Sequence, residues 1–191
     1  DFFFGSSRQG DLAMLQSVGL MSGFSAEAVA AQQHQAQRIS SSLIRTDLQH
    51  GRLHEAAQKL GRPYSIEGKV VRGKQLGRTL GYPTANIRLQ RKKPALMGIY
   101  ATWIHGIGQQ PIAGVSSLGT RPTVNGREPL LEAHLFDFDD DLYRRRIRVE
   151  FVCKLRDEIK FDTLDALVMQ MGQDAAQARA VLALQPIGEC A

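Results

Sequence analysis

The sequence is poor in cysteine and has no long apolar run. Cys153 and Cys190 are too few for a disulfide framework or a cysteine-rich zinc site, and we expect Cys153 to be a buried, small apolar side chain. No apolar run approaches the roughly 18 residues that a membrane-spanning helix needs, and the N-terminus has no signal-peptide pattern. The expected location is therefore cytoplasmic.

The common phosphate-binding motifs are also missing. The chain contains no G-x-x-x-x-G-K-[ST], no G-x-G-x-x-G and no H-R-D with D-F-G. These absences exclude P-loop enzymes, Rossmann-type dinucleotide-binding proteins and protein kinases. The acidic run Asp137–Asp141 lacks calcium-loop spacing, and we interpret it as a solvated turn before Arg144–Arg146.

Positive charge is concentrated in the second part of the chain. The formal net charge is +5; residues 1–60 hold five Lys/Arg and five Asp/Glu, against 19 and 14 in residues 61–191. This excess suits nucleic acid, an anionic membrane or a polyanionic small molecule such as ATP. Charge alone leaves the three open.

The periodicity of the sequence changes near Pro63. Before it, a Ser-capped segment that stops at Gly51 and a second segment over 53–60 predict two short helices. From Tyr64 onward the period is two, which predicts a mainly β domain, either a small antiparallel barrel or a sandwich. The strand candidates are "YSIEGKVVRG", "GIYATWIHG", "QPIAGVSSLG", "LLEAHLFDF" and "RIRVEFVCKLR".

Two elements near the C-terminus have clear patterns. The last strand candidate places five apolar residues on one face: Ile147, Val149, Phe151, Cys153 and Leu155. After it, "FDTLDALVMQM" predicts a helix capped by Asp162 and broken at Gly172, followed by a second short helix over 174–184.

The segment "GKQLGRTLGYPTAN" predicts a phosphate and metal site. In an extended segment, Thr84 and Asn86 project to the same side, and their oxygens suit Mg²⁺. Backbone N–H groups at glycines can approach phosphate oxygens, and a Lys or Arg can add positive charge. The residues concerned are Gly73, Lys74, Gly77, Arg78 and Gly81. The alternative is a glycine-rich turn whose Thr and Asn satisfy the backbone.

Glu132 is the candidate general base. It shares strand parity with largely apolar residues, Leu130, His134, Phe136 and Phe138. Burial raises the pKa of a carboxyl group and makes it a better proton acceptor near neutrality, as the phosphorylation of an alcohol requires. The alternative is a rim residue paired with an Arg; for His134 we expect a structural role.

Several of these motifs together resemble one family. Five segments resemble, in order and spacing, the riboflavin kinase domain of bacterial bifunctional riboflavin kinase/FMN adenylyltransferases. They are "GKVVRGKQLGRTLGYPTANI", "GIYATW", "GVSSLGTRPTVNG", "LEAHLFDFDDDLYRRRIRVEF" and "KLRDEIKF". The resemblance implies a six-stranded antiparallel, Greek-key-like barrel with a C-terminal helix over residues 61–185, then a tail over 186–191. It also implies an ATP-dependent transferase that phosphorylates riboflavin at its 5′-hydroxyl, giving FMN and ADP.

The resemblance also implies site residues. Thr84 and Asn86 would hold Mg²⁺ against the ATP phosphates, Gly73 and Arg78 would line the nucleotide, and Glu132 would be the catalytic base. The segment "GTRPTVNG" would be a mobile flap over the flavin, with Arg156 nearby. Its expected flavin-binding residues are Gly119, Thr120, Arg121, Pro122 and Thr123.

Residues 1–60 resemble only the end of the adenylyltransferase domain of the same family. The similar segments are "DFFFGSSRQGDLAML" and "ISSSLIR", with Phe3 where the family usually has Arg and Ser42 where it usually has Thr. The H-x-G-H motif of that nucleotidyltransferase does not occur in the sequence. We therefore expect a partial α/β nucleotidyltransferase remnant without adenylyltransferase activity.

Two other functions remain open from sequence. One is a flavin-binding fragment that lacks catalysis. The other is a basic barrel that binds single-stranded nucleic acid, but such barrels interleave aromatic and basic residues, and aromatic residues make up only 7% of this chain. We therefore expect neither nucleic acid nor membrane among the partners.

Overall fold

The computed structural model describes residues 2–73, 75–89, 93–123 and 126–184; for residues 122, 123, 126 and 127 it describes the backbone alone. The chain divides into two compact units, Asp1–Ile39 and Ser40–Ala191. The sequence predicted a domain boundary between residues 60 and 61. The structure instead places the two helices before the first barrel strand in the same unit as the barrel. We describe each unit separately.

The first unit contains little regular structure. A 3₁₀ turn, η1 (Ser6–Arg8), precedes the helix α1 (Leu12–Ser22). A hairpin with two residues in each strand follows, formed by β1 (Gln33–His34) and β2 (Gln37–Arg38). The Asp11 carboxylate accepts a hydrogen bond from the Met14 amide at 2.9 Å and caps α1. Gly23, in the left-handed conformation, ends that helix.

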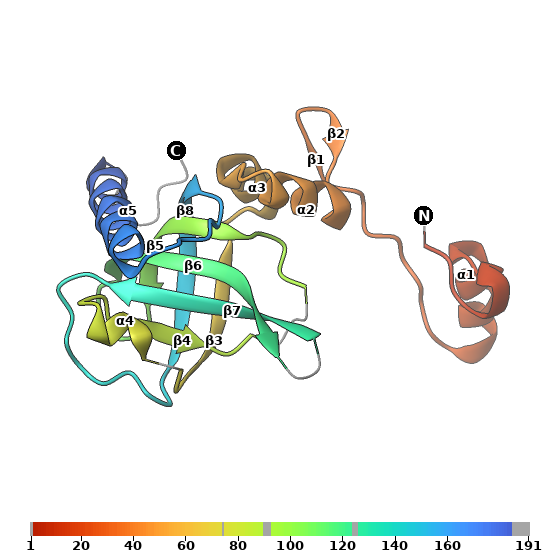
Figure 1. Ribbon diagram of the computed structural model, residues 1–191. Helices are drawn as coiled ribbons and strands as arrows, with labels where there is room; N and C mark the ends of the chain where they lie inside the picture. The colour runs from red at the N-terminus through yellow and green to blue at the C-terminus, as the bar shows by residue number, and fades with distance from the viewer. Residues whose placement is uncertain (1, 74, 90–92, 124–125, 185–191) are drawn as a thin grey trace. The chain divides into compact units, whose positions relative to one another are not determined.

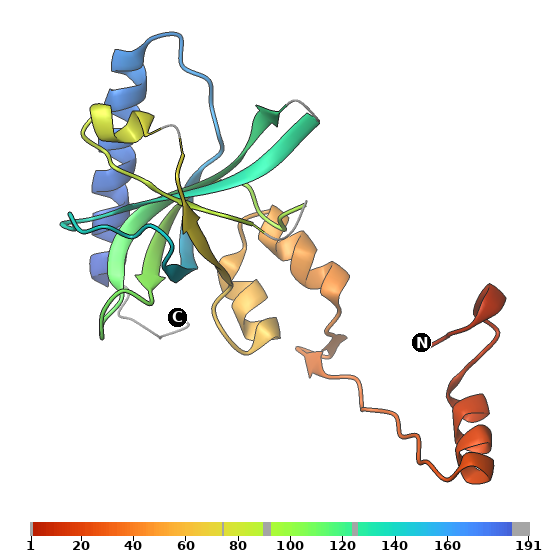
Figure 2. The same cartoon turned by 90° about the horizontal axis from the view of Figure 1, so that it is seen from below.

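The second unit is built on a closed antiparallel barrel (Figure 1). Its strands follow one another around the barrel in the order β3–β4–β7–β6–β5–β8, which confirms the predicted six-stranded barrel. Their bounds are β3 (Ser65–Val71), β4 (Ala85–Ile87), β5 (Gly98–His105), β6 (Ile112–Thr123), β7 (Gly126–Leu135) and β8 (Arg146–Arg156). The β6–β7 hairpin extends beyond the other strands (Figure 2).

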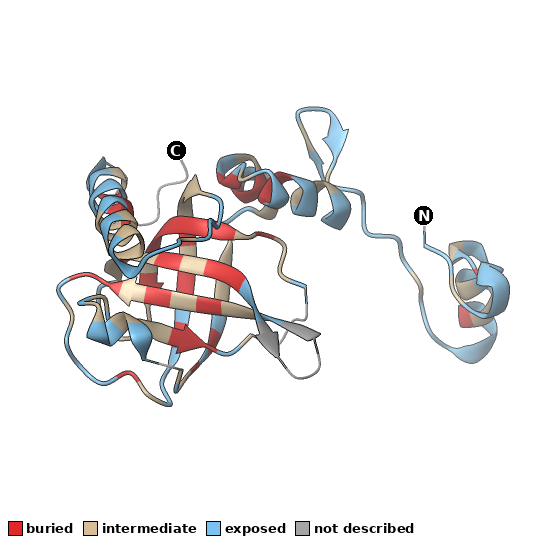
Figure 3. Cartoon of the chain, viewed as in Figure 1, coloured by how far each residue is buried: buried red, intermediate tan, exposed pale blue. Residues whose placement is uncertain are grey.

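Alternate residues of the strands fill the barrel. Buried and half-buried positions alternate along much of β6 and β7 in Figure 3, as expected for strands with one face in the core. Tyr100, Leu118, Leu131 and Val149 belong to this interior and are fully buried. The polar groups inside are paired, since the hydroxyls of Thr102 and Ser116 lie 2.8 Å apart.

A β-bulge changes the predicted face pattern of β8. Ala101 of β5 pairs with Cys153, but the next residue, Thr102, pairs with Phe151. The extra residue shifts the alternation, so Phe151 packs in the barrel while Cys153 and Leu155 pack in a second apolar cluster outside it. The prediction of one continuous apolar face was therefore wrong beyond Phe151. Cys153 is half-buried, and burial raises the pKa of its thiol.

The C-terminal helix α5 (Leu164–Leu184) covers the second apolar cluster. It is continuous through Gly172, so the predicted break and second helix were wrong. Its N-terminus is capped by the Thr163 hydroxyl, which accepts from the Ala166 amide at 3.2 Å, rather than by Asp162. Ala178 and Leu182 are buried in the cluster, which holds α5 on the barrel. None of the helices within the described ranges combines the length and apolar character needed to cross a membrane.

The short helices α2 (Ser41–Gln49) and α3 (Leu53–Leu60) pack on the barrel core. Their positions agree with the prediction, and Ser40 caps α2 by accepting from the Leu43 amide at 3.2 Å. Leu48, Leu53 and Ala56 join the apolar cluster of the barrel. This shared core explains why the compact unit begins at Ser40.

A buried carboxylate fixes the turn between α2 and α3. Asp47 is 4% exposed and contacts Arg52 and Lys59, each at 2.9 Å. Burial alone would raise the pKa of Asp47, but hydrogen bonds from Lys59 and Arg52 and their charges hold it below its usual value. The carboxylate is therefore stabilised in its charged form.

We expect Asp47→Asn to lower the free energy of unfolding by about 2 kcal/mol at pH 7, because it leaves two cations without their partner. Because the pKa of Asp47 is lower in the folded than in the unfolded state, the charged carboxylate stabilises the fold at pH values above its unfolded pKa, near 3.8. This contribution disappears as the pH falls through the pKa of the folded state. Urea denaturation at pH 7 and pH 3 measures both effects. Asp162→Asn, at an exposed position, is the control; equal losses for both variants would contradict this role of Asp47.

Candidate active site

Strands β4 and β7 carry a polar cluster. Asn86 and Glu132 are direct partners across these two strands, and Thr84 lies two residues before Asn86. The side chains of Thr84 and Asn86 lie close enough to the Glu132 carboxylate for hydrogen bonding with them to lower its pKa. The prediction that Thr84 and Asn86 project to the same side is confirmed, and both meet Glu132. We call Thr84, Asn86 and Glu132 the β4–β7 cluster.

The cluster lies on the outer face of the barrel. Leu131, Ala133 and Leu135 of β7 belong to the barrel core, so Glu132 projects from the opposite face of the strand. The apolar face of β7 that fills the barrel therefore carries Leu131, Ala133 and Leu135. The sequence pattern had placed Glu132 on the apolar face of this strand, and that prediction was wrong. Glu132 is half-buried and Asn86 is 6% exposed.

Burial is the main influence on Glu132 and raises its pKa above the usual value. The charge of Arg121 and the hydrogen bonds from Thr84 and Asn86 oppose this effect, while the charge of Glu158 adds to it. A carboxylate with a raised pKa is a stronger base, and so can accept a proton from an alcohol more readily.

The cluster offers oxygen ligands to a hard cation. By donating hydrogens to Glu132, the Thr84 hydroxyl and the Asn86 amide keep their oxygen lone pairs for another partner. Neutral oxygens beside one carboxylate suit a divalent ion whose other ligands are water and phosphate. Within the described ranges there is no group of three or more His, Cys, Asp and Glu that could hold a metal by themselves.

Two of the predicted glycines support the cluster directly. A Cβ on Gly73 would lie 2.5 Å from the amide atoms of Asn86, and one on Gly77 would lie 3.4 Å from the Thr84 hydroxyl oxygen. Gly81 has a φ of 83°, and a Cβ there would meet nothing within 4 Å, so this glycine serves the turn. The segment between β3 and β4 also contains a single helical turn, α4 (Leu76–Thr79), which the sequence did not predict.

A cavity adjoins the cluster. It has a volume of about 310 Å³ and includes Thr84 and Arg78 in its wall. Their predicted contacts with a nucleotide stay a prediction. Lys74, the other predicted cation, lies outside the described residues. The remaining wall comes from the end of β3, the start of β4, the end of β7 and the acidic turn: Val70, Pro83, Ala85, Leu135, Phe138, Asp139, Asp140, Asp141, Leu142 and Tyr143. The acidic run is therefore part of a cavity wall as well as a turn.

The predicted flap is largely a strand. Gly119, Thr120 and Arg121 lie in β6 and pair with β7, and the backbone of Pro122 and Thr123 continues the same strand. The side chains of Pro122 and Thr123 lie outside the described ones. Arg121 is exposed, pairs with Glu128 at 3.3 Å and acts on Glu132 through its charge. The flap predicted for residues 119–126 is therefore strand over residues 119–123, and its residues 124 and 125 lie outside the described ones. The predicted flavin contacts of this segment stay a prediction.

Arg156 makes structural contacts at the end of β8. Its guanidinium donates to both oxygens of Asp174 at 2.8 and 2.6 Å and lies 5.9 Å from the ring centroid of Phe161. Asp174 is 4% exposed on α5, so this ion pair ties the helix to the barrel. The predicted flavin contact of Arg156 stays a prediction.

Sequence reasoning missed two residues beside the cluster. Ser117 of β6 is the direct partner of Glu132 on its other side. The Glu158 carboxylate lies where a Cβ on Gly119 would be, and its charge reaches Glu132. Ser117 could have been found from the strand register, which the sequence does not give. Glu158 stands in a loop without a periodic signal.

Comparisons with known proteins agree on one family. A family model described as "Flavokinase: Riboflavin kinase" matches residues 60–182. The bifunctional riboflavin kinase/FMN adenylyltransferase of Haemophilus influenzae is 46% identical over 180 residues, which cover 94% of this chain and 58% of that protein. That of Escherichia coli K12 is 42% identical over 179 residues, with 94% and 57% covered. The chain therefore spans slightly more than half the length of these relatives.

A solved structure shares the fold. A chain titled "Macrolide-efflux Protein" from Streptococcus pneumoniae superposes with a TM-score of 0.73 at 32% identity, covering 94% of this chain and 58% of that one. The similarity therefore includes most of this sequence.

The raised pKa of Glu132 makes a prediction about stability. When the pKa of an acid is higher in the folded than in the unfolded state, the free energy of unfolding is greatest at low pH, where the acid is protonated in both states. It decreases as the pH rises from the pKa of the unfolded state to that of the folded state. We therefore expect Glu132→Gln to raise the melting temperature at pH 7, with the gain disappearing below about pH 4.5, the usual value. Calorimetry at several pH values measures this; a variant that is less stable at pH 7 would contradict it.

Proposed function

Because the chain belongs to the riboflavin kinase family, we propose that it transfers the γ-phosphate of ATP to the 5′-hydroxyl of riboflavin, giving FMN and ADP. The observation that carries the proposal is the β4–β7 cluster, in which a hydroxyl, an amide and a carboxylate meet beside a cavity. Phosphoryl transfer depends on positioning and on stabilising charge, and these groups can do both.

Thr84 and Asn86 are the proposed ligands of Mg²⁺ bound with ATP. Their oxygens are hard donors, and Gly73 and Gly77 leave room for both side chains to lie close to the backbone. The ion would neutralise charge on the phosphates of the nucleotide. Arg78, in the wall of the same cavity, adds a fixed positive charge.

Glu132 is the proposed catalytic base. Its carboxylate would orient the 5′-hydroxyl of riboflavin and accept its proton as the oxygen–phosphorus bond forms. The raised pKa supports this role, because a more basic carboxylate takes the proton with a smaller penalty. Hydrogen bonds from Thr84 and Asn86 hold the carboxylate in place.

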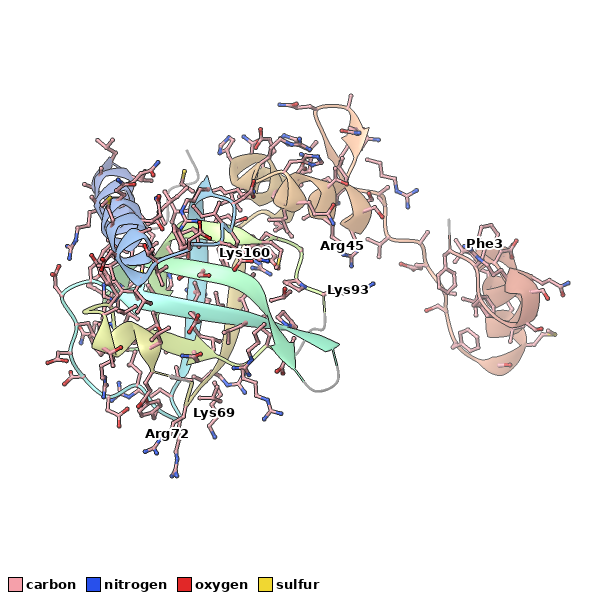
Figure 4. The ribbon with its side chains drawn as sticks, in the orientation of Figure 1. Phe3, Arg45, Lys69, Arg72, Lys93 and Lys160 are labelled. Carbon is pink, nitrogen blue, oxygen red and sulfur yellow. The ribbon has the colours of Figure 1, made fainter. Side chains whose placement is uncertain are left out.

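The nucleotide side of the site is the 310 Å³ cavity. The guanidinium of Arg72 lies 5.4 Å from the ring centroid of Tyr143, which lines the cavity. Both Arg72 and Lys69 point outward from the barrel near β3 (Figure 4). The cavity thus has both charges at its wall: Arg72 and Arg78 can attract the phosphates of ATP, and Asp139, Asp140 and Asp141 can face a divalent ion bound with them. Among the partner classes left open by charge we therefore favour a nucleotide bound with a metal ion.

The flavin side of the site adjoins Glu132. Two large apolar side chains that adjoin residues of this region in the sequence are exposed, Leu76 at 54% and Ile159 at 53%. Leu76 precedes Gly77, which borders Thr84, and Ile159 follows Glu158, which borders Gly119. A planar apolar ring would cover such side chains, which supports a flavin as the acceptor.

An activity assay tests the proposal. The protein is incubated with riboflavin and Mg-ATP, and FMN and FAD are separated by chromatography. We expect FMN without FAD, because the 191-residue sequence contains no H-x-G-H motif. Folded protein that forms no FMN would contradict the kinase assignment, and FAD would contradict the expected lack of adenylyl transfer. The cytoplasm stays the expected location.

Glu132→Gln tests the base. We expect kcat to fall by about two to four orders of magnitude, because an amide cannot accept the proton. Riboflavin affinity, measured by flavin fluorescence, should stay within a few-fold of the wild type. Glu128→Gln is the control, since Glu128 is an exposed carboxylate on the same strand. A normal kcat for Glu132→Gln would remove this residue from the mechanism.

Gly73→Ala tests the placement of Asn86. The new methyl group would collide with the Asn86 amide, so we expect the Kd of Mg-ADP to rise about tenfold. Gly108→Ala is the control, because a Cβ there meets nothing within 4 Å. Calorimetric titration with Mg-ADP measures both. Equal affinities for the two variants would show that Asn86 does not contribute to nucleotide binding.

A further inference from the structure

His134 makes a contact beside the β4–β7 cluster and has no part in the proposed proton transfer or metal binding. Its Nδ1 lies 2.8 Å from the carbonyl oxygen of Pro83. His134 stands two residues after Glu132 on β7, and Pro83 is the residue before Thr84. One hydrogen bond therefore joins the strand that carries the carboxylate to the segment that carries the two neutral oxygen ligands.

The imidazole ring is held in a fixed orientation. The ring of Tyr82 packs against it edge-on at a centroid distance of 5.3 Å, and that of Phe136 does so at 5.7 Å. A carbonyl oxygen only accepts, so Nδ1 carries the hydrogen in this contact. With two aromatic rings packed against it, the imidazole of His134 is restricted in turning away from Pro83.

Helix α5 supports both aromatic neighbours. A Cβ on Gly172 would lie 3.2 Å from the Tyr82 hydroxyl, so the helix passes close to that ring. Arg179 lies 4.2 Å from the ring centroid of Phe136 and donates to both oxygens of Asp137 at 2.8 and 2.9 Å. The orientation of His134 is thus set by contacts from an element distant in sequence.

The segment that receives this hydrogen bond is short of backbone support. Strand β4 begins at Ala85, so Pro83 and Thr84 precede its regular ladder. Proline also has no N–H to donate. A hydrogen bond to the Pro83 carbonyl also fixes the backbone of Thr84, because the planar peptide group that contains this carbonyl includes the Thr84 nitrogen.

From this geometry we propose that His134 is a positioning residue for the metal–nucleotide side of the site. Its Nδ1–H holds the Pro83 carbonyl, and through it places the Thr84 hydroxyl next to Glu132. The proposal rests on the proposed kinase function. It gives His134 a role in binding Mg-nucleotide that is separate from the role of Glu132 in proton transfer.

Two substitutions separate positioning from packing. Both His134→Asn and His134→Leu remove the ring and its contacts with Tyr82 and Phe136. Only Asn keeps an N–H donor at the same number of bonds from the backbone as Nδ1. We expect His134→Leu to raise the Kd of Mg-ADP, and the KM for Mg-ATP, about three- to tenfold, the usual effect of one lost hydrogen bond. His134→Asn should stay within about twofold of the wild type.

Riboflavin affinity and melting temperature complete the test. Riboflavin binding should be the same in both variants, and both melting temperatures should be lowered, because both variants lose the ring. If the Kd of Mg-ADP follows the melting temperature and does not distinguish Asn from Leu, His134 is a packing residue and the proposal is wrong. Mg-ADP titration does not need turnover, so this result is independent of the kinase assay. Wild-type protein that binds Mg-ADP but forms no FMN would contradict the proposed function and leave the His134 result intact.

Discussion

The pairing of Asn86 with Glu132 across β4 and β7 is the contact on which the proposed site depends. Register in an antiparallel sheet decides which side chains are neighbours, and a slip of one residue would move Glu132 to the interior of the barrel. The interior position is already filled, since Leu131 and Ala133 are fully buried in the core. The apolar core therefore fixes the polar pair on the outer face.

The rest of the second unit supports this pair from two directions. From inside, the closed barrel removes any free strand edge and holds β4, only three residues long, between β3 and β7. From outside, α5 lies on the barrel and reaches the site through Tyr82 and Phe136. The Arg156–Asp174 ion pair adds a tie between β8 and α5, and both partners are mostly buried. A short strand with polar residues can thus be kept in a defined position.

The sequence was sufficient for the local features of this site and insufficient for the long-range ones. Period-two patterns found the five longer strands, and the i, i+2 geometry placed Thr84 and Asn86 on one side, because both follow from the local backbone. The resemblance supplied the sixth strand. Ser117 and Glu158 could not be assigned, since their proximity to Glu132 comes from strand register and from a loop after β8.

Tertiary packing also overruled three local signals. Gly172 costs a helix about 1 kcal/mol relative to Ala, which is less than α5 gains by burying Ala178 and Leu182. The bulge opposite Ala101 and Thr102 shifted the face pattern of β8, and no residue type marks it in the sequence. The domain boundary at residue 60 followed a change of periodicity, but helices α2 and α3 share the apolar core of the barrel.

The most direct test of the central claim is whether a divalent ion bound with nucleotide comes next to Asn86. The sequence contains only two asparagines, Asn86 and Asn125, so ¹⁵N-labelled asparagine gives two pairs of side-chain amide signals, and Asn125→Ser assigns them. Paramagnetic Mn²⁺ can replace Mg²⁺ in the presence of ADP. The account predicts strong broadening of the Asn86 side-chain signal by Mn²⁺-ADP and none by Mg²⁺-ADP. An Asn86 signal that stays sharp while Mn²⁺-ADP is bound would contradict it.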